Sequence, residues 1–135
     1  MASTIRLELV TPERLLVSEE VDEVVAPGYE GEFGVLPGHT HFLVILNIWV
    51  LWYRKEGAVK KIALGGGFAE VNHDRLVVMA DTAERADEID LERARRARDR
   101  AEARLKELSL DNGTLAKVRA ALQRALAGMA AGGGE

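Results

Sequence analysis

The sequence lacks cysteine altogether, which removes several classes of site at once. Without a thiol among the 135 residues, disulfides and thiolate metal sites are excluded. There is no excess of positive charge either, and the net charge of -4 gives no general reason to expect nucleic acid or an anionic membrane as a partner. Hydrophobic residues nevertheless make up 47% of the chain, too many for wholesale disorder. We therefore expect one ordinary domain, or a small domain with an appendage.

Long apolar runs are also missing. The longest, residues 42–53, is too short to cross a bilayer as a helix, which needs roughly 18 or more residues. Residues 1–9 have no apolar core and carry charges at Arg6 and Glu8, so we expect no export signal. Membrane association is therefore expected only through a partner.

Residues 1–84 have the pattern of short β-strands separated by glycine-rich turns. Residues 5–9 alternate apolar and charged side chains, which is typical of a half-buried strand. Similar runs recur up to residue 80, and the three glycines Gly65, Gly66 and Gly67 indicate a sharp bend between two of them. About ten short strands at this spacing predict a β-sandwich or a flattened barrel.

The run from Phe42 to Tyr53 is apolar on both faces of the strand that it predicts. Strict alternation would place its even-numbered residues on one face and its odd-numbered residues on the other, with Asn47 the one clearly polar position. A strand buried on both sides has this pattern, and so has a strand that presents one face to a partner.

Residues 85–135 change to Ala, Arg, Glu and Leu at helical spacing. Asp87 is the candidate N-cap, with Asp90 three residues further on. Two apolar stripes follow, separated by a turn at residues 109–113: Leu91, Ala94, Ala101, Leu105 and Leu108, then Leu115, Val118, Leu122, Ala125 and Met129. We predict a second domain, an antiparallel α-helical hairpin with a flexible tail. Because such narrow stripes bury little apolar area, the hairpin should be weakly held and able to leave the sandwich.

Two groups of polar residues were considered as binding sites. His39 and His41 would share one face of a strand, and Glu32 could join them around a metal ion, but no third ligand has a telling spacing, so we favour loop histidines with other partners. The first helix is rich in arginine, but interleaved acidic residues favour a solvated face over nucleic-acid binding. A single phosphate-bearing ligand suits it better, because arginine pairs bidentately with phosphate oxygens.

No pattern in the sequence indicates an active site. The glycine run lacks the spacing of a dinucleotide fingerprint and is followed by a predicted strand, not a helix. No phosphate-binding loop is present, and neither a catalytic triad nor a carboxylate pair stands out. We therefore expect no catalytic residues and no required cofactor.

Several motifs give the chain a family resemblance when they are taken together in order. They are residues 20–24 (EVDEV), 31–39 (GEFGVLPGH), 65–71 (GGGFAEV) and 80–84 (ADTAE), followed by the two predicted helices. On these motifs the chain resembles the epsilon subunit of the bacterial F-type ATP synthase over nearly its whole length.

The resemblance implies a β-sandwich and a helical hairpin in the rotating central stalk, a non-catalytic part of the proton-transporting complex. The partners implied are the gamma subunit, the membrane ring of c subunits and, through an extended hairpin that inhibits ATP hydrolysis, the alpha and beta subunits of the catalytic head. The implied location is peripheral, on the cytoplasmic face of the bacterial plasma membrane. The residues expected to face partners are Glu32, Phe33, Pro37, Gly38 and His39.

Some bacterial members of that family bind ATP on the folded hairpin through an Ile/Leu-Asp-x-x-Arg-Ala motif. This chain matches it at Ile89, Asp90, Arg93 and Ala94. Arg119 and Arg124 are the candidates for the arginines that the second helix adds in such binders. Helix capping alone would also explain Asp90, and an exposed ion pair would explain Arg93. The motif therefore indicates either a site for ATP as a regulatory ligand or a helix cap that binds no nucleotide.

One segment departs from the family pattern. Where the family shows a turn between two strands, this chain has Asn47, Ile48 and Trp49. Because the turn signal is lost, the sequence does not predict whether the strand breaks here or whether the usual partner contact forms.

Three functions follow from these observations. The first is a coupling and regulatory subunit of the rotary stalk. The second is a free-standing ATP sensor whose hairpin folds on the nucleotide. The third is a small enzyme on a β scaffold, for which no residue pattern argues.

Overall fold

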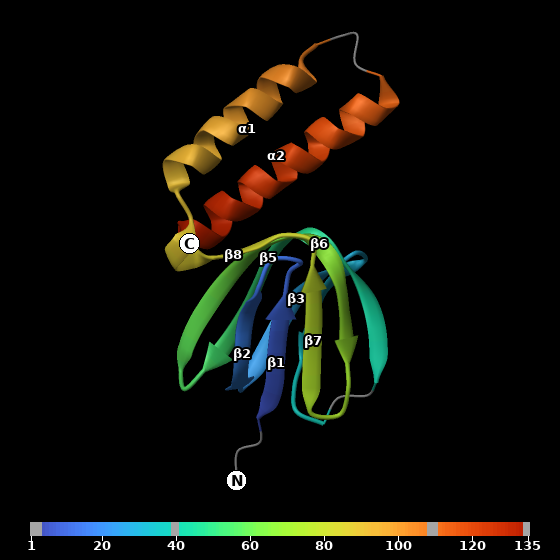
Figure 1. The fold of residues 1–135 in the computed structure, drawn as a ribbon, viewed down its shortest axis with the longest axis vertical. Helices are drawn as coiled ribbons and strands as arrows, with labels where there is room; N and C mark the ends of the chain where they lie inside the picture. Colours follow the sequence, from blue (N-terminus) through green and yellow to red (C-terminus); the bar gives the residue numbers. More distant parts are fainter. Residues whose placement is uncertain (1–3, 39–40, 108–110, 134–135) are drawn as a thin grey trace.

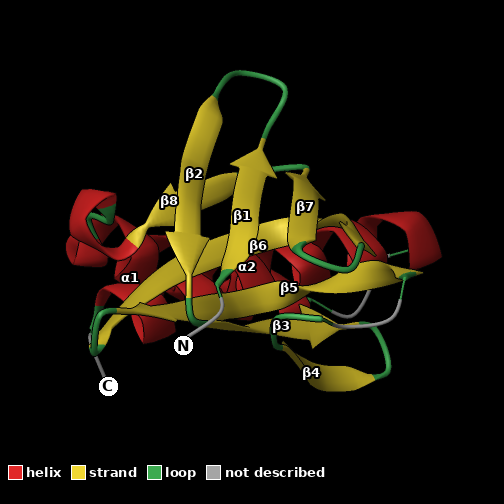
Figure 2. Cartoon of the chain, turned by 90° about the horizontal axis from the view of Figure 1, so that it is seen from below, coloured by secondary structure: helices red, strands yellow, loops and turns green. Residues whose placement is uncertain are grey.

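The structure, a computed structural model, describes residues 4–38, 41–107 and 111–133. Its eight strands are β1 (Ile5–Val10), β2 (Leu15–Val21), β3 (Glu23–Gly28), β4 (Gly31–Val35), β5 (Phe42–Lys55), β6 (Ala58–Val71), β7 (Arg75–Ala80) and β8 (Ala83–Arg85). They form one folded-over sheet in the order β2-β1-β7-β6-β5-β3-β4, with β8 paired to β6. In Figure 2, β1, β2 and β7 lie on one side and β3, β4 and β5 on the other. The predicted sandwich and hairpin are confirmed, with eight strands in place of about ten.

The main core lies between these two layers of strands. β1 alternates as predicted, with Ile5, Leu7 and Leu9 each 0% exposed and their neighbours half-buried. Because β1 is hydrogen-bonded to β2 on one side and runs parallel to β7 on the other, these side chains reach the centre of the sandwich. Burial of this kind is worth about 1.5–3 kcal/mol for each large aliphatic side chain.

Two predicted strands on either side of the glycine run are in fact one strand, β6. It continues through Gly66 and Gly67, whose φ angles are 94° and 135°. A side chain at Gly67 would place its Cβ 2.1 Å from the carbonyl oxygen of Met79 on β7. Glycine is therefore required, and it bends the strand without ending it.

The strict alternation predicted for β5 is wrong. Leu46 and Leu51 both belong to the main core, although an even and an odd position should face opposite ways. The register of β3 against β5 shifts along this part of the ladder, so the inward-facing set changes between these residues. β5 itself runs without a break, as the lost turn signal indicated.

The glycine-rich segment before β5 carries three apolar residues, Phe33, Val35 and Leu36, that could anchor it to the core. Its first part forms β4, an edge strand paired with β3. Val35 is 0% exposed and Phe33 packs edge-on against Phe42 with ring centroids 5.8 Å apart, as anchors should. Leu36 is 54% exposed and anchors nothing, because it follows the end of the strand.

The helical region begins with a short 3-10 turn, η1 (Ala86–Glu88), and continues with α1 (Leu91–Leu105) and α2 (Asn112–Gly132). Asp87 lies in η1, so its prediction as N-cap is wrong; Asp90 caps α1 by accepting a hydrogen bond from the Arg93 N–H (3.1 Å). Asp111 caps α2 in the same way, and the bond from the Thr114 N–H lowers the pKa of Asp111. Part of the turn expected at 109–113 falls outside the described residues.

The hairpin lies across one end of the sandwich, with α2 next to β5 and β6 (Figure 1). A second apolar cluster joins them: Val50 and Ala63 of the sheet and Ala127 and Ala131 of α2, with Trp49, Ile89 and Ala130 at its edge. The Gln123 amide also donates to the Ile48 carbonyl (3.1 Å). The segment that departs from the family pattern therefore packs against this chain's own second helix. Within the described residues, neither helix is long and apolar enough to span a bilayer.

Candidate functional site

A cleft of about 410 Å³ opens where the hairpin meets the sandwich. This volume falls within the usual range for small-molecule sites, roughly 300–1,000 Å³. Five of the six residues predicted to bind ATP line it: Ile89, Asp90, Arg93, Ala94 and Arg124. The opposite wall comes from β6 and the strand that precedes η1, with Leu64, Gly65, Thr82, Ala83 and Glu84.

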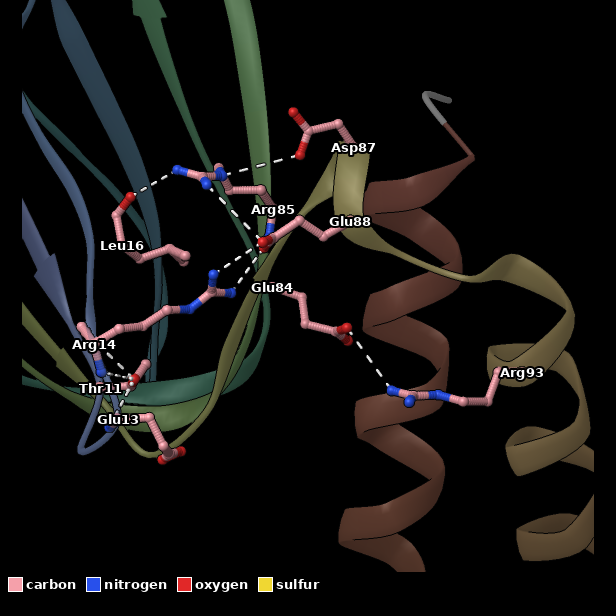
Figure 3. Close-up of polar contacts among 9 residues, drawn as sticks. All are labelled: Thr11, Glu13, Arg14, Leu16, Glu84, Arg85, Asp87, Glu88 and Arg93. Carbon is pink, nitrogen blue, oxygen red and sulfur yellow. Dashed lines mark hydrogen bonds and ion pairs between the residues drawn. The ribbon is translucent and has the colours of Figure 1, made fainter.

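The joint between the sandwich and the hairpin (residues 86–90) and the first turn of α1 set the polar side of the cleft. Asp90 caps α1 through its Oδ1, so its carboxylate is held at the start of the helix, within one turn of Arg93. Arg93 lies one turn on, with its side chain 69% exposed, and its Nη2 is 3.8 Å from Glu84 Oε2 (Figure 3). That separation is an ion pair and not a direct hydrogen bond. An anionic ligand would therefore compete with Glu84 for this guanidinium.

The second helix brings one predicted arginine into the cleft and leaves the other out. Arg124 lines the cleft, whereas Arg119 is exposed on α2 and does not. Five residues on an α-helix correspond to an offset of roughly 140°, so the two side chains leave the helix on different faces. The cleft thus has two guanidinium groups, from Arg93 and Arg124, on facing elements.

Small residues make room between these polar groups. A Cβ at Gly128 would meet the Ala94 Cβ at 3.7 Å, and a Cβ at Gly65 would overlap the Thr82 hydroxyl at 1.9 Å. The same Cβ would lie 3.5 Å from the Arg124 Cδ, so the sandwich wall also approaches α2 at Gly65. The sequence did not place Glu84, Thr82 or Gly65 at a binding site, because their nearness to α1 depends on the tertiary fold.

The residues expected to face partners come from β4 and from the loop that follows it. Pro37 and Gly38 lie beside the turn between β6 and β7, where the Gly38 N–H donates to the His73 carbonyl (2.7 Å). This turn is at the end of the sandwich away from the helices (Figure 1). Glu32 is exposed on β4, paired with Pro27, and Phe33 is half-buried beside it. His39 lies outside the described residues.

The other polar groups make ordinary surface contacts. His41 Nε2 is 3.1 Å from Glu70 Oε2, and no group of three potential metal ligands is found among the described residues. The arginine-rich face of α1 contains ion pairs within the helix and its end: Arg95 with Glu92 (2.7 Å), Arg98 with Asp99 (3.0 Å) and Arg104 with Glu107 (3.6 Å). These pairs neutralise much of the positive charge on that surface.

Comparisons with known proteins cover both parts of the fold. Residues 4–86 match the family model of the ATP synthase delta/epsilon chain β-sandwich domain, and residues 87–131 match that of its long α-helix domain. The chain is 50% identical over 129 residues to the ATP synthase epsilon chain of Nitratidesulfovibrio vulgaris (strain DP4), covering 96% of each chain. It is also 50% identical over 133 residues to that of Geobacter sulfurreducens, covering 98% of this chain and 96% of the relative.

Solved structures of ATP synthases contain similar chains. One chain in the Euglena gracilis mitochondrial ATP synthase, a structure of OSCP/F1/c-ring, superposes with a TM-score of 0.77 at 30% identity, over 90% of this chain and 76% of that one. A chain in the central stalk/c-ring structure from Tetrahymena thermophila superposes with a TM-score of 0.62 at 14% identity, covering 95% of this chain and 96% of that one. The second likeness concerns the fold alone.

Proposed function

The chain belongs to the ATP synthase delta/epsilon chain family, and from that premise we propose that it is the epsilon subunit in the central stalk of an F-type ATP synthase. Both family domains are matched in order, and the relatives named as epsilon chains align over nearly their whole length. In this role the chain has no active site of its own. It works by coupling the proton-driven c ring to the catalytic head and by regulating ATP hydrolysis there.

The two-part construction of the molecule supports a coupling and regulatory role. The sandwich has a continuous core of large aliphatic side chains, whereas the hairpin is joined to it through a smaller cluster rich in alanine. A rigid body with a loosely attached arm can stay bound to the gamma subunit and c ring while the arm moves toward the alpha and beta subunits. The free end of the sandwich, with Pro37 and Gly38, is left to face the ring. The chain is then attached peripherally to the cytoplasmic face of the bacterial membrane, through the other subunits of the complex.

The cleft is the observation that carries the regulatory part of the proposal. It exists only while the hairpin is docked, because Arg93, Ala94 and Arg124 belong to the helices and Gly65 and Thr82 to the sandwich. A ligand that fills it therefore binds the docked state in preference to any other. At a hundredfold excess over its dissociation constant, such a ligand stabilises that state by about 2.7 kcal/mol.

ATP suits the chemistry of this cleft. The two guanidinium groups can pair with phosphate oxygens, with Arg93 exchanging its long contact to Glu84 for a closer one. Asp90 offers a carboxylate oxygen to the donor groups of the base or the sugar, and Ala94 leaves space for a flat ring. ATP would thus hold the hairpin against the sandwich and relieve inhibition when nucleotide is plentiful.

Titration calorimetry with millimolar ATP tests the nucleotide part, with Arg93→Ala as the variant. Arg96→Ala is the matched control, because it removes the same charge from an exposed position of α1 outside the cleft lining. We expect heat of binding and ATP-dependent compaction in the wild type and in Arg96→Ala, and neither in Arg93→Ala. If the wild type shows neither signal, Asp90 serves only as a helix cap and ATP is not the regulator.

Capture of the chain by an isolated gamma subunit separates the stalk subunit from a free-standing ATP sensor. A stalk subunit should bind gamma with or without nucleotide. ATP binding without binding to gamma would favour the free-standing sensor, a function that the same cleft also supports.

A further inference from the structure

Arg14 is held in place by its own turn before it reaches any partner. The turn between β1 and β2 is closed by a hydrogen bond from the Thr11 N–H to the Arg14 carbonyl (2.9 Å). The Thr11 hydroxyl oxygen also accepts the N–H groups of Glu13 and Arg14, at 3.3 and 3.2 Å. Since this local network fixes the backbone, little backbone entropy is left to lose when the Arg14 side chain forms a contact.

The partner of Arg14 is Glu88, 74 residues away at the end of η1. The two side chains pair bidentately: Arg14 Nη1 donates to Glu88 Oε2 and Arg14 Nη2 to Glu88 Oε1, both at 2.9 Å (Figure 3). Glu88 Oε1 also accepts the backbone N–H of Arg85 (3.0 Å), which closes η1 on itself. Bidentate pairing of this kind fixes orientation as well as distance.

A second contact runs in parallel to the first. Arg85 Nη1 donates to the Leu16 carbonyl at the start of β2 (2.9 Å), so β8 and η1 are tied to the β1–β2 hairpin at two points. The hydrogen bonds from Arg14 and from the Arg85 N–H lower the pKa of Glu88 to about 2. The carboxylate is therefore ionised, and the pair formed, throughout the neutral range.

We propose that Arg14 and Glu88 are positioning residues for the hairpin: their ion pair fixes η1 on the sandwich and so sets how readily the hairpin leaves it. We refer to this pair as the clasp. Only Ile89 and Asp90 separate η1 from α1. With the clasp closed, the hairpin can pivot at those two residues alone, and both are already held, Ile89 in the second apolar cluster and Asp90 as the cap of α1.

Opening the clasp frees a longer joint. The segment from Ala86 to Asp90 can then change direction as a unit, because the remaining tie to the β1–β2 hairpin, from Arg85 to Leu16, lies before this segment. The clasp thus acts on the docking equilibrium from outside the nucleotide cleft, whose lining includes neither residue. The biological use of the clasp rests on the proposed function, in which movement of the hairpin regulates ATP hydrolysis.

The charges around the clasp do not replace it. Asp87 is 3.9 Å from Arg85 Nε with its side chain 83% exposed, and Glu84 faces Arg93 across the cleft. Glu13 and Glu84 also lie near enough to Arg14 to raise its pKa, after the larger effect of Glu88. None of the three makes a hydrogen bond to Arg14 within the described residues.

The test measures docking directly with a reporter thiol, which is convenient because the chain has no cysteine. Ala127→Cys places one in the second apolar cluster, where residue 127 is 1% exposed, so a thiol reagent reaches it only when the hairpin lifts. Ala69→Cys is the companion reporter in the main core, where residue 69 is 0% exposed and is reached only on unfolding of the sandwich. The full chain is labelled without nucleotide, in each background.

Three substitutions are compared on these reporters: Arg14→Ala, Glu88→Gln and Arg6→Ala. The last is the matched control, since Arg6 pairs with Glu20 (3.4 Å) between β1 and β2, away from the hairpin. Loss of an exposed ion pair of this kind is expected to raise the equilibrium constant for lifting of the hairpin roughly two- to fivefold. Labelling at residue 127 should therefore rise by that factor in Arg14→Ala and Glu88→Gln, and stay unchanged in Arg6→Ala. In the double variant, Arg14→Ala with Glu88→Gln, labelling at residue 127 should rise no further than in Glu88→Gln alone, because either substitution already breaks the pair.

Salt gives an independent check. The clasp is partly exposed, so screening should raise wild-type labelling at residue 127 as ionic strength increases, and Arg14→Ala should lose this dependence. The proposal would be overturned if residue 127 were labelled at the wild-type rate in both clasp variants. It would also be overturned if labelling at residue 69 rose equally. Failure of the wild-type chain to bind gamma would overturn the proposed function instead, and would leave the labelling result standing.

Discussion

Replacing Gly128 with alanine should stabilise the docked hairpin. Gly128 is buried in α2, and glycine in a helix interior is less favourable than alanine by about 0.8–1.0 kcal/mol. The added methyl would meet the Ala94 Cβ at 3.7 Å, an ordinary van der Waals separation that requires no movement. Burying one more methyl adds up to about 0.8 kcal/mol. We therefore expect Gly128→Ala to raise the stability of the hairpin by roughly 1–1.5 kcal/mol.

The same substitution one turn further on should have the opposite sign. At Gly132 a Cβ would lie 2.9 Å from Cγ2 and 3.1 Å from Cβ of Ile89, and Ile89 belongs to the joint. Since Gly132 is the last residue of α2, the gain in helix propensity there is also smaller. Urea unfolding followed by helical circular dichroism, without nucleotide, measures both variants. Equal effects at the two positions, or a loss of stability in Gly128→Ala, would refute this account of how α2 packs.

Three further predictions concern the sandwich, the joint and the cleft. Gly67→Ala should unfold the sandwich at markedly lower urea concentration, because its Cβ would lie 2.1 Å from the Met79 carbonyl oxygen at a φ of 135°. The pKa of Glu88 is about 2 in the folded chain against an ordinary 4.5, so its contribution to stability is fully present above pH 4.5 and is lost as the pH falls toward 2; acid titration of Glu88→Gln should lack that component. In calorimetry, Arg124→Ala should weaken ATP binding at least tenfold, the effect of losing about 1.4 kcal/mol, whereas Arg119→Ala should leave it unchanged.

Much of this fold follows from local patterns. The alternation in residues 5–9 and the helical spacing after residue 90 each predict the element that forms there, because each depends on neighbouring residues alone. The glycine run at 65–67 predicts the bend, but not that one strand continues through it. The motif residues Ile89, Asp90, Arg93 and Ala94 also come together predictably, since they lie within one helical turn of the joint.

The errors occur where tertiary contacts decide. The change of face in β5 depends on pairing with β3, which its own sequence does not encode. The buried surface of α2 that meets the sheet was missed, because Ala127 and Ala131 give little hydrophobic signal. Asp87 and Asp90 are equally good caps by composition, and the short turn η1 decides between them. The clasp joins residues 74 positions apart, so no spacing rule could have indicated it.

The ATPase rate of a reconstituted catalytic head with gamma, measured with and without this chain, tests the central claim most directly. We predict that the chain lowers the rate of ATP hydrolysis at low nucleotide, and that the inhibition weakens as ATP rises toward millimolar and the hairpin docks on the sandwich. In Arg93→Ala the inhibition should persist at high ATP. An unchanged hydrolysis rate, with the chain shown to be bound to gamma, would contradict the claim that its hairpin regulates the head.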